Sequence, residues 1–268
     1  MKHSDTSIQA RDRAFLKRIF AHYDAHGRHD LVWRKNITPY RILVSEIMLQ
    51  QTQVSRVLPK FMEWMKAYPT LSALGKASFS DVLKLWQGLG YQRRAKALHE
   101  IAKTVRVLPK TYEELLALKG IGPYTASALC AFAYDTFPEH LVETNIRTAL
   151  IEEFHQGETS VHDGVLYDDL ARLSKEKLAR DRGARHFYYA LMDYGAYLKS
   201  QKISHNKKSA HYSVQTPFEG SLRQLRAKVL FAITHHEALP DDDRTDTVLE
   251  KLVSEGYIVR KGARYAIS

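Results

Sequence analysis

Cysteine is nearly absent from this chain of 268 residues, which contains only Cys130. A structural iron–sulfur cluster or a cysteine-rich zinc site needs several thiolates, so neither fits within one chain. We therefore expect no cofactor and no metal ion. Cys130 lies in a small and apolar segment, residues 125–132, where a cysteine usually serves as a small core residue.

Long apolar runs are also lacking. No stretch approaches the ~20 uninterrupted apolar residues that a membrane span needs. The first six residues, Met-Lys-His-Ser-Asp-Thr, have no apolar core of the kind that a secretory signal carries. We expect a soluble, cytoplasmic protein with no membrane partner.

Acidic residues are outnumbered by basic ones. Thirty Asp and Glu stand against forty Lys and Arg, which gives a formal net charge of +10. A polyanion such as nucleic acid is the natural first candidate for a partner. A basic but merely solvated surface is the alternative that charge alone leaves open.

Strand-like alternation is scarce up to about residue 200, and apolar residues there recur at helical spacing. Prolines and glycines interrupt the pattern often enough to predict helices of roughly 8–15 residues joined by short loops. We therefore expect an all-α body over residues 1–200, large enough to bury a sizeable core.

The pattern changes after this body. Residues 201–221 are polar, basic and aperiodic, which is typical of a connecting segment. Two amphipathic helices are predicted at 223–234 and 245–255, followed by two short strands around a Lys-Gly turn. Residues 222–268 thus suggest a small winged-helix-like α+β unit, which would either contact DNA through its basic hairpin or simply pack.

A helix, a tight Gly-x-Gly turn and a second helix are predicted at about residues 115–126. Gly120 and Gly122 permit positive φ and close backbone approach, while the second helix offers N–H groups and the positive end of its dipole. Together with Lys119 and Thr125 this segment indicates a hairpin that grips a DNA phosphate. An ordinary turn is the less favoured alternative.

A carboxyl group is predicted on the apolar stripe of the helix at 40–54. Glu46 has apolar residues as its same-face neighbours. Partial burial would disfavour the carboxylate and raise its pKa, as a general acid near neutral pH requires. The alternative is an edge glutamate whose stem packs while its head reaches water.

Side chains suited to DNA follow this helix. Gln50 and Gln51 supply amides that can bond base edges or fill the gap left by a flipped nucleotide. Tyr91 supplies an aromatic face beside Arg93 and Arg94, the combination expected where a protein stacks on bases and neutralises phosphates. Plain helix surface with solvated arginines is the alternative.

A second carboxyl group, Glu143, precedes a helix and should stay ionised at the positive end of the helix dipole. It could simply cap that helix. Yet one acid with a raised pKa and one that stays charged is the pair that glycosidic chemistry needs, to protonate a leaving group and to stabilise an oxocarbenium-like sugar.

At these residues the chain resembles the helix-hairpin-helix DNA glycosylases, and among them the MutY-type adenine glycosylases, across roughly residues 10–200. The resemblance is carried by residues 45–54 (Ser-Glu-Ile-Met-Leu-Gln-Gln-Thr-Gln-Val), 88–91, 120–122 and 190–196. It implies a two-lobed helical fold in which Glu46 protonates adenine and Gln50 and Tyr91 occupy the opened duplex.

The chain departs from that family at three places. Glu143 stands where the family carries Asp, and a misplacement of about an ångström can cost ~10²-fold in rate. The family's four-cysteine cluster is missing, and so is its large C-terminal domain that reads 8-oxoguanine. In addition, Tyr124 occupies the position where strand-cleaving relatives place a Schiff-base lysine, and a phenol cannot do that chemistry.

The sequence therefore predicts a monomeric, monofunctional DNA N-glycosylase acting on double-stranded DNA with a mispaired or damaged base, most simply adenine opposite guanine or 8-oxoguanine. Its candidate catalytic residues are Glu46, Glu143, Tyr124 and Asn145. Two alternatives remain: a thymine or uracil mismatch glycosylase of the same fold, which Tyr124 and the Glu-Thr-Asn segment would suit, and a catalytically inactive DNA-binding relative.

Overall fold

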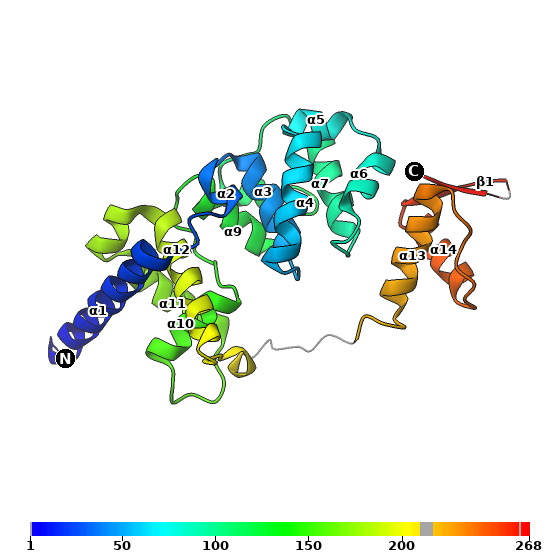
Figure 1. Ribbon diagram of the computed structural model, residues 1–268. Helices are drawn as coiled ribbons and strands as arrows, with labels where there is room; N and C mark the ends of the chain where they lie inside the picture. Colours follow the sequence, from blue (N-terminus) through cyan, green and yellow to red (C-terminus); the bar gives the residue numbers. More distant parts are fainter. Residues whose placement is uncertain (1, 210–216, 263) are drawn as a thin grey trace. The chain divides into compact units, whose positions relative to one another are not determined.

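The computed structural model describes residues 2–209, 217–262 and 264–268, and most of these are helical (Figure 1). The all-α body predicted from the sequence is confirmed. In chain order the elements are α1 Lys2–His26, α2 Val32–Lys35, α3 Pro39–Leu49, α4 Val54–Ala67, α5 Leu71–Lys76, α6 Phe79–Trp86, α7 Arg93–Thr104, α8 Tyr112–Leu116, α9 Pro123–Phe132, α10 Thr144–Phe154, α11 Asp163–Ser174, α12 Lys177–Ser200, the 3₁₀ turn Asn206–Lys208, α13 Leu222–His235, α14 Thr245–Ser254, β1 Ile258–Lys261 and β2 Arg264–Ile267.

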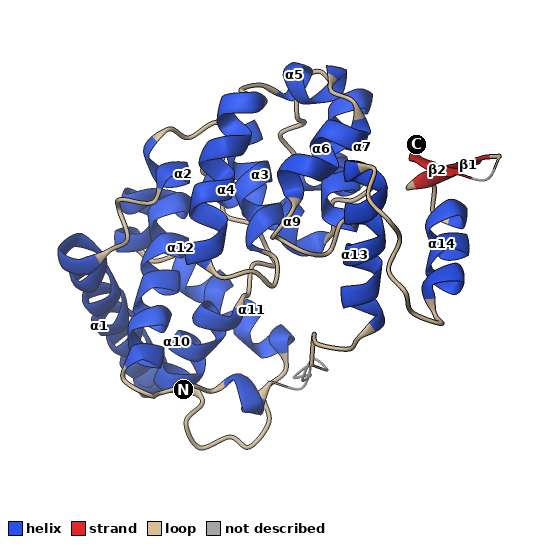
Figure 2. Cartoon of the chain, turned by 45° about the vertical axis from the view of Figure 1, so that its right-hand side comes forward, coloured by secondary structure: helices blue, strands red, loops and turns tan. Residues whose placement is uncertain are grey.

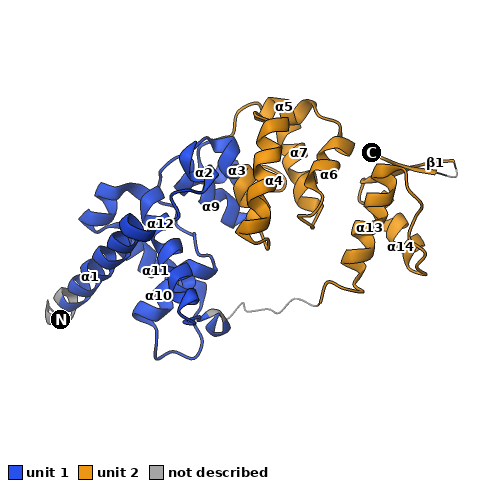
Figure 3. Cartoon of the chain, viewed as in Figure 1, with its two compact units in different colours: residues 1–43, 109–117, 121–213 blue, residues 44–108, 118–120, 214–268 orange. Residues whose placement is uncertain are grey.

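The chain divides into two compact units, which Figure 3 colours separately. The first unit comprises residues 1–43, 109–117 and 121–213, and the second comprises residues 44–108, 118–120 and 214–268. The division falls within α3, so Glu46 belongs to the second unit. The C-terminal residues group with α4–α7, and a separate domain at 222–268 stays a prediction.

The first unit is built around α12, which packs against α1 on one side and α10 on another. The helix is interrupted at Gly183, whose backbone leaves the helical region. Asp193, about two turns before the end of α12, is buried and pairs with Arg28 and Arg34 at 2.6 and 2.7 Å. Burial alone would raise the pKa of Asp193, but the two guanidinium groups outweigh it and hold that pKa below its usual range.

The second unit has an aromatic core, in which Trp64 of α4 and Trp86 of α6 meet edge to face at 5.4 Å. At the C-terminal end, α13 packs against α14 and against β2, and the strands pair antiparallel from Ile258↔Ile267 to Lys261↔Arg264 (Figure 2). The two helices and the hairpin expected in this stretch are therefore confirmed.

The basic connecting segment predicted at 201–221 departs in part from expectation, and its residues 210–216 lie outside the described residues. Residues 206–209 are not an unattached linker. The N–H of Val161 donates to the carbonyl of Lys208 at 2.8 Å, and Nζ of Lys208 donates to the carbonyl of Gln156 at 2.7 Å. This part of the segment thus belongs to the first unit.

Across the parts of the chain that the structure describes, none of the helices has the length and apolar character of a membrane span.

An ion network centred on His155 ties α10 to α11. Its Nε2 lies 2.6 Å from Asp169 and its Nδ1 lies 2.6 Å from Glu158, while Arg172 bridges Asp169 to Asp12. Burial of the imidazole lowers its pKa, but the hydrogen bonds and charges of the two carboxylates outweigh burial and raise the pKa of His155 above its ordinary value.

A raised folded-state pKa means that protonated His155 stabilises the fold below its unfolded pKa of about 6.5, and that this contribution is lost as the pH rises through the folded value. We predict that His155→Gln lowers the free energy of unfolding more at about pH 5.5 than at about pH 8.5. Urea unfolding of both proteins at the two pH values measures this, and an equal loss at both would contradict it.

Candidate DNA-binding and catalytic site

The helix α3 carries the first candidate acid. It begins at Pro39, where the N–H of Arg41 donates to Oγ1 of Thr38, and it ends at Leu49, short of the predicted end at residue 54. Residues 42–48 are all buried, and Glu46 is 6% exposed. The expected burial of Glu46 is confirmed, so the reading in which its head reaches water does not describe it. Its role as an acid stays a prediction.

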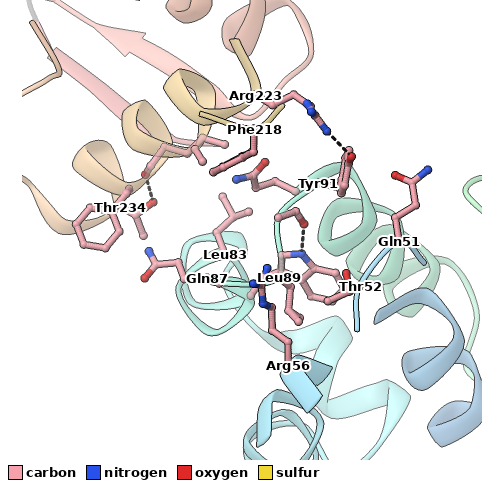
Figure 4. Close-up of a pocket in the computed structure, with 17 residues that line it drawn as sticks. Gln51, Thr52, Arg56, Leu83, Gln87, Leu89, Tyr91, Phe218, Arg223 and Thr234 are labelled. Atoms are coloured by element: carbon pink, nitrogen blue, oxygen red, sulfur yellow. Dashed lines mark hydrogen bonds between the residues drawn. The ribbon is translucent and has the colours of Figure 1, made fainter. Parts of the chain in front are cut away.

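Two loops of the second unit carry side chains in the left-handed region. Gln51, just after α3, has φ +55°, and Tyr91, just before α7, has φ +47°. This conformation costs a non-glycine residue about 1 kcal/mol or more and persists where surrounding structure enforces it. Gln51 is exposed and Tyr91 is half-buried, and both line one pocket (Figure 4). Gln50, with its carbonyl turned inward, does not line it.

Arg94 holds the two loops that carry Gln51 and Tyr91. Its guanidinium is buried between the two loops and donates to the carbonyls of Ile47, Met48, Gln50, Leu89 and Gly90 and to Oγ1 of Thr52, at 2.6–3.1 Å. Carbonyls at a helix C-terminus need such external partners. Burial lowers the pKa of Arg94 to about 10, so the group remains charged at neutral pH.

This corrects the expectation that Arg94 contacts DNA. The residue is 5% exposed, because it shares the inner face of α7 with Leu98 and Ile101. The spacing of four and then three residues could have revealed this, since it marks one helix face. Arg93 is exposed, with its guanidinium 5.8 Å from the centre of the Tyr91 ring, and stays a candidate for DNA contact.

The hairpin between α8 and α9 uses its two glycines differently. Gly120 has φ +98°, and a Cβ there would stand 2.6 Å from the Cβ of Ala97. Gly122 has an ordinary φ of −94° and caps α9, and a Cβ there would meet nothing within 4 Å. Only Gly120 therefore needs positive φ, whereas Gly122 leaves open surface for a close approach at the helix N-terminus.

Two side chains of the hairpin, those of Lys119 and Thr125, differ in their exposure. The side chain of Lys119 is 91% exposed, with Nζ 3.9 Å from Glu100. Thr125 is 2% exposed, because every residue of α9 from 125 to 132 faces the interior. The side chain of Thr125 is therefore buried, and a DNA contact by Thr125 stays a prediction for its backbone near the start of α9. Lys119 stays a candidate.

Glu143 is the N-cap of α10. Its Oε1 accepts from the N–H groups of Asn145 and Ile146 at 2.8 and 2.9 Å, and its Oε2 accepts from Nδ2 of Asn145 at 3.1 Å. The expected position at the positive end of a helix is confirmed. Gly195 of α12 packs so closely here that a Cβ would stand 2.0 Å from the Asn145 carbonyl oxygen, which leaves no room for a side chain.

Lys199 is a residue that the sequence reasoning missed. It lies at the very end of the predicted body, next to the polar segment, and no role is expected for it from the sequence. In the structure α12 continues to Ser200, which places Lys199 one helical turn beyond Gly195. Burial lowers the pKa of Lys199, and the nearby carboxylate of Glu143 opposes that shift only in part.

Tyr124, the second residue of α9, is half-buried. The described residues contain no group of three His, Cys, Asp or Glu side chains that could hold a metal ion.

Comparison with known proteins decides the family. The profile of the HhH-GPD superfamily of base excision DNA repair proteins matches residues 44–190, from the buried half of α3 into α12. The chain belongs to this superfamily. HhH-GPD membership confirms the fold expected from the hairpin and from the glutamate-bearing helix.

Individual relatives extend the similarity to nearly the whole chain. The chain is 33% identical to the adenine DNA glycosylase of Mycolicibacterium smegmatis, over 93% of its own length and 94% of that protein. The adenine DNA glycosylase of Mycobacterium tuberculosis H37Rv is also 33% identical, over 90% and 89%. A solved thermostable thymine-DNA glycosylase shares the fold with a TM-score of 0.60 at 22% identity, over 77% of this chain and 98% of that one.

We predict that Arg94→Lys destabilises the protein by about 1–3 kcal/mol, because one ammonium group cannot satisfy the carbonyls of two loops and a buried acceptor is left unpaired. Urea unfolding measures the change. Arg93→Lys, at the exposed neighbouring position, is the matched control and should stay within about 0.5 kcal/mol of wild type. Equal stability of the two variants would contradict the role given to Arg94.

Proposed function

We propose that the chain is a MutY-type adenine DNA glycosylase that acts as a monomer, in the cytoplasm, on adenine mispaired with guanine or 8-oxoguanine in duplex DNA. The observation that carries the proposal is the match to two proteins named adenine DNA glycosylase over about nine-tenths of both partners. It is supported by the buried carboxyl group of Glu46 on the helix at which the HhH-GPD match begins.

Two carboxyl groups would divide the chemistry. Burial disfavours the charged form of Glu46, which suits a group that gives a proton to the departing adenine. Glu143, held by N–H groups at a helix N-terminus, suits a group that keeps negative charge near the developing oxocarbenium ion. The N-glycosidic bond breaks as Glu46 protonates the base, so the base leaves neutral. Water then adds to the sugar carbon, and the proton that the water loses restores the carboxyl group of Glu46.

Strand cleavage is not expected from this arrangement. The hairpin carries the phenol of Tyr124 at the start of α9, and a phenol forms no Schiff base with the sugar. The product would be an intact strand with an abasic site.

We predict that Glu46→Gln reduces base release by roughly 10²–10⁴-fold while duplex binding survives, because the amide keeps the shape and loses the transferable proton. Single-turnover rates on duplexes containing A opposite 8-oxoguanine, A opposite G, T opposite G and U opposite G measure this and identify the base. Release of thymine or uracil alone would replace the adenine assignment. No release from any duplex by the wild-type chain would favour the inactive DNA-binding relative.

Glu143 supplies the matching test within the same assay. Glu143→Asp keeps a carboxylate that can cap α10, so its stability should change little, while Glu143→Gln weakens the cap by about 0.5–2 kcal/mol. A site adapted to the longer side chain loses activity with Asp, whereas a site impaired by it gains activity. Unchanged rates in Glu46→Gln and Glu143→Gln would contradict the two-carboxylate mechanism.

We predict that borohydride reduction during turnover traps no covalent protein–DNA adduct, because Tyr124 replaces the Schiff-base lysine. Lys199 makes the test sharper, since a lysine whose pKa is lowered by burial is the kind that attacks sugar aldehydes. An adduct that persists in Lys119→Ala and vanishes in Lys199→Ala would identify Lys199 as a nucleophile and overturn the monofunctional assignment.

A further inference from the structure

A pocket of about 420 Å³ lies in the second unit between α13 and the loop that precedes α7 (Figure 4). Its lining combines flat ring faces with amide and guanidinium donors, and the residues that matter here are Gln51, Gln87, Arg56, Tyr91, Phe218 and Arg223. Aromatic faces stack on bases of any sequence, and such donors read base edges. The lining therefore has the chemistry of a nucleobase site.

Arg223 and Tyr91 form a bridge at the rim of this pocket. Nη1 of Arg223 donates to the hydroxyl of Tyr91 at 2.6 Å, and the guanidinium carbon lies 5.8 Å from the ring centre. The same two residues line a second pocket of about 350 Å³, together with Arg93, Arg226 and Lys251. Glu255 lines it as well and pairs with Arg226. Basic side chains of this kind neutralise phosphates.

The helix that carries Arg223 is anchored to α7. Tyr257 lies between two cations, with Nζ of Lys96 at 4.9 Å and the guanidinium carbon of Arg226 at 4.7 Å from its ring centre. Lys96 also donates to the carbonyl of Gly256 at 3.0 Å. Arg223 is thus held beside the Tyr91 loop by contacts that do not involve Arg223 itself.

We propose that Arg223 is a specificity-determining residue that contacts the base opposite the excised one. The inference rests on the proposed function, because it places the lining residues Gln51 and Tyr91, both expected from the sequence to contact DNA, in the duplex that a glycosylase opens. A side chain bonded to the tip of Tyr91 then lies beside the base left without a partner. A guanidinium donates well to O6 of guanine, an acceptor that 8-oxoguanine keeps. Arg223 therefore favours guanine-type bases over adenine and cytosine, which present amino donors at the corresponding edge.

The test uses the full chain and duplexes in which a tetrahydrofuran abasic analogue faces G, 8-oxoguanine, A, C or T, so that no excision step enters the measurement. We expect wild type to bind the G and 8-oxoguanine duplexes most tightly. Arg223→Gln should weaken binding to those two by roughly 5- to 100-fold, the effect of losing one good base contact, and change binding to the A and C duplexes little.

Lys228→Gln is the matched control, because it removes one positive charge from the exposed side of the same helix. It should weaken binding to all five duplexes equally. Tyr91→Phe, which keeps the ring and removes the hydroxyl that accepts from Arg223, should also reduce the preference for guanine-type bases. This second variant keeps the test decisive if Arg223→Gln unfolds the C-terminal helices.

Three results overturn the inference. They are a wild-type chain without opposite-base preference, an Arg223→Gln variant that keeps the preference, and a variant that loses affinity equally for all five duplexes, which would make Arg223 a phosphate contact. Failure of the proposed function looks different, because a wild-type chain that binds none of the abasic duplexes more tightly than undamaged DNA would remove the glycosylase assignment itself.

Discussion

The buried guanidinium of Arg94 is the group on which the geometry of the second unit depends. The loop after α3 passes through a left-handed Gln51, and the loop before α7 turns through two glycines and a left-handed Tyr91. Local donors satisfy only part of the carbonyls of these two segments, and the carbonyls of Met48 and Leu89 accept from Arg94. Arg94 offers donors in a fixed fork, and it satisfies both segments at once. The guanidinium of Arg94 therefore compensates the backbone strain at Gln51 and Tyr91. Removing this side chain would leave several carbonyl acceptors without their donor.

This arrangement links the candidate acid to the candidate duplex contacts. The carbonyls of Ile47 and Met48, which follow Glu46 directly, are two of the acceptors, so the group that sets the loops also fixes the end of the helix that carries the carboxyl group. The same loop reaches Arg223 through the Tyr91 hydroxyl. A chain of direct contacts thus runs from the neighbours of Glu46 to α13, within one compact unit.

Periodicity and punctuation predict the helices, the burial of Glu46 and the C-terminal hairpin, because each depends on local pattern. The sequence predictions fail at polar or charged residues that are buried, although residues of these types usually lie on the surface. The sequence predicts a DNA contact for Arg94, yet backbone carbonyls accept from its buried guanidinium, and the side chain of Thr125 is buried in α9. No role is expected for Lys199, because it lies at the end of the predicted body beside a polar segment. The role of Arg223 depends on a contact across 132 residues that no local pattern encodes.

An ion pair and hydrogen bonds hold the described residues that follow α12. In the family that the chain resembles, a four-cysteine cluster follows this helix, whereas here His205 pairs with Glu152 and the carbonyl of Lys208 accepts from the N–H of Val161. Each such bond is worth only about 0.5–1.5 kcal/mol, far less than a metal cluster, but together they tie the segment to α10. Glu143 caps the start of α10, and Lys199 stands near that carboxylate at the end of α12. The segment that follows Lys199 is therefore bonded back to the far end of the helix that Glu143 caps.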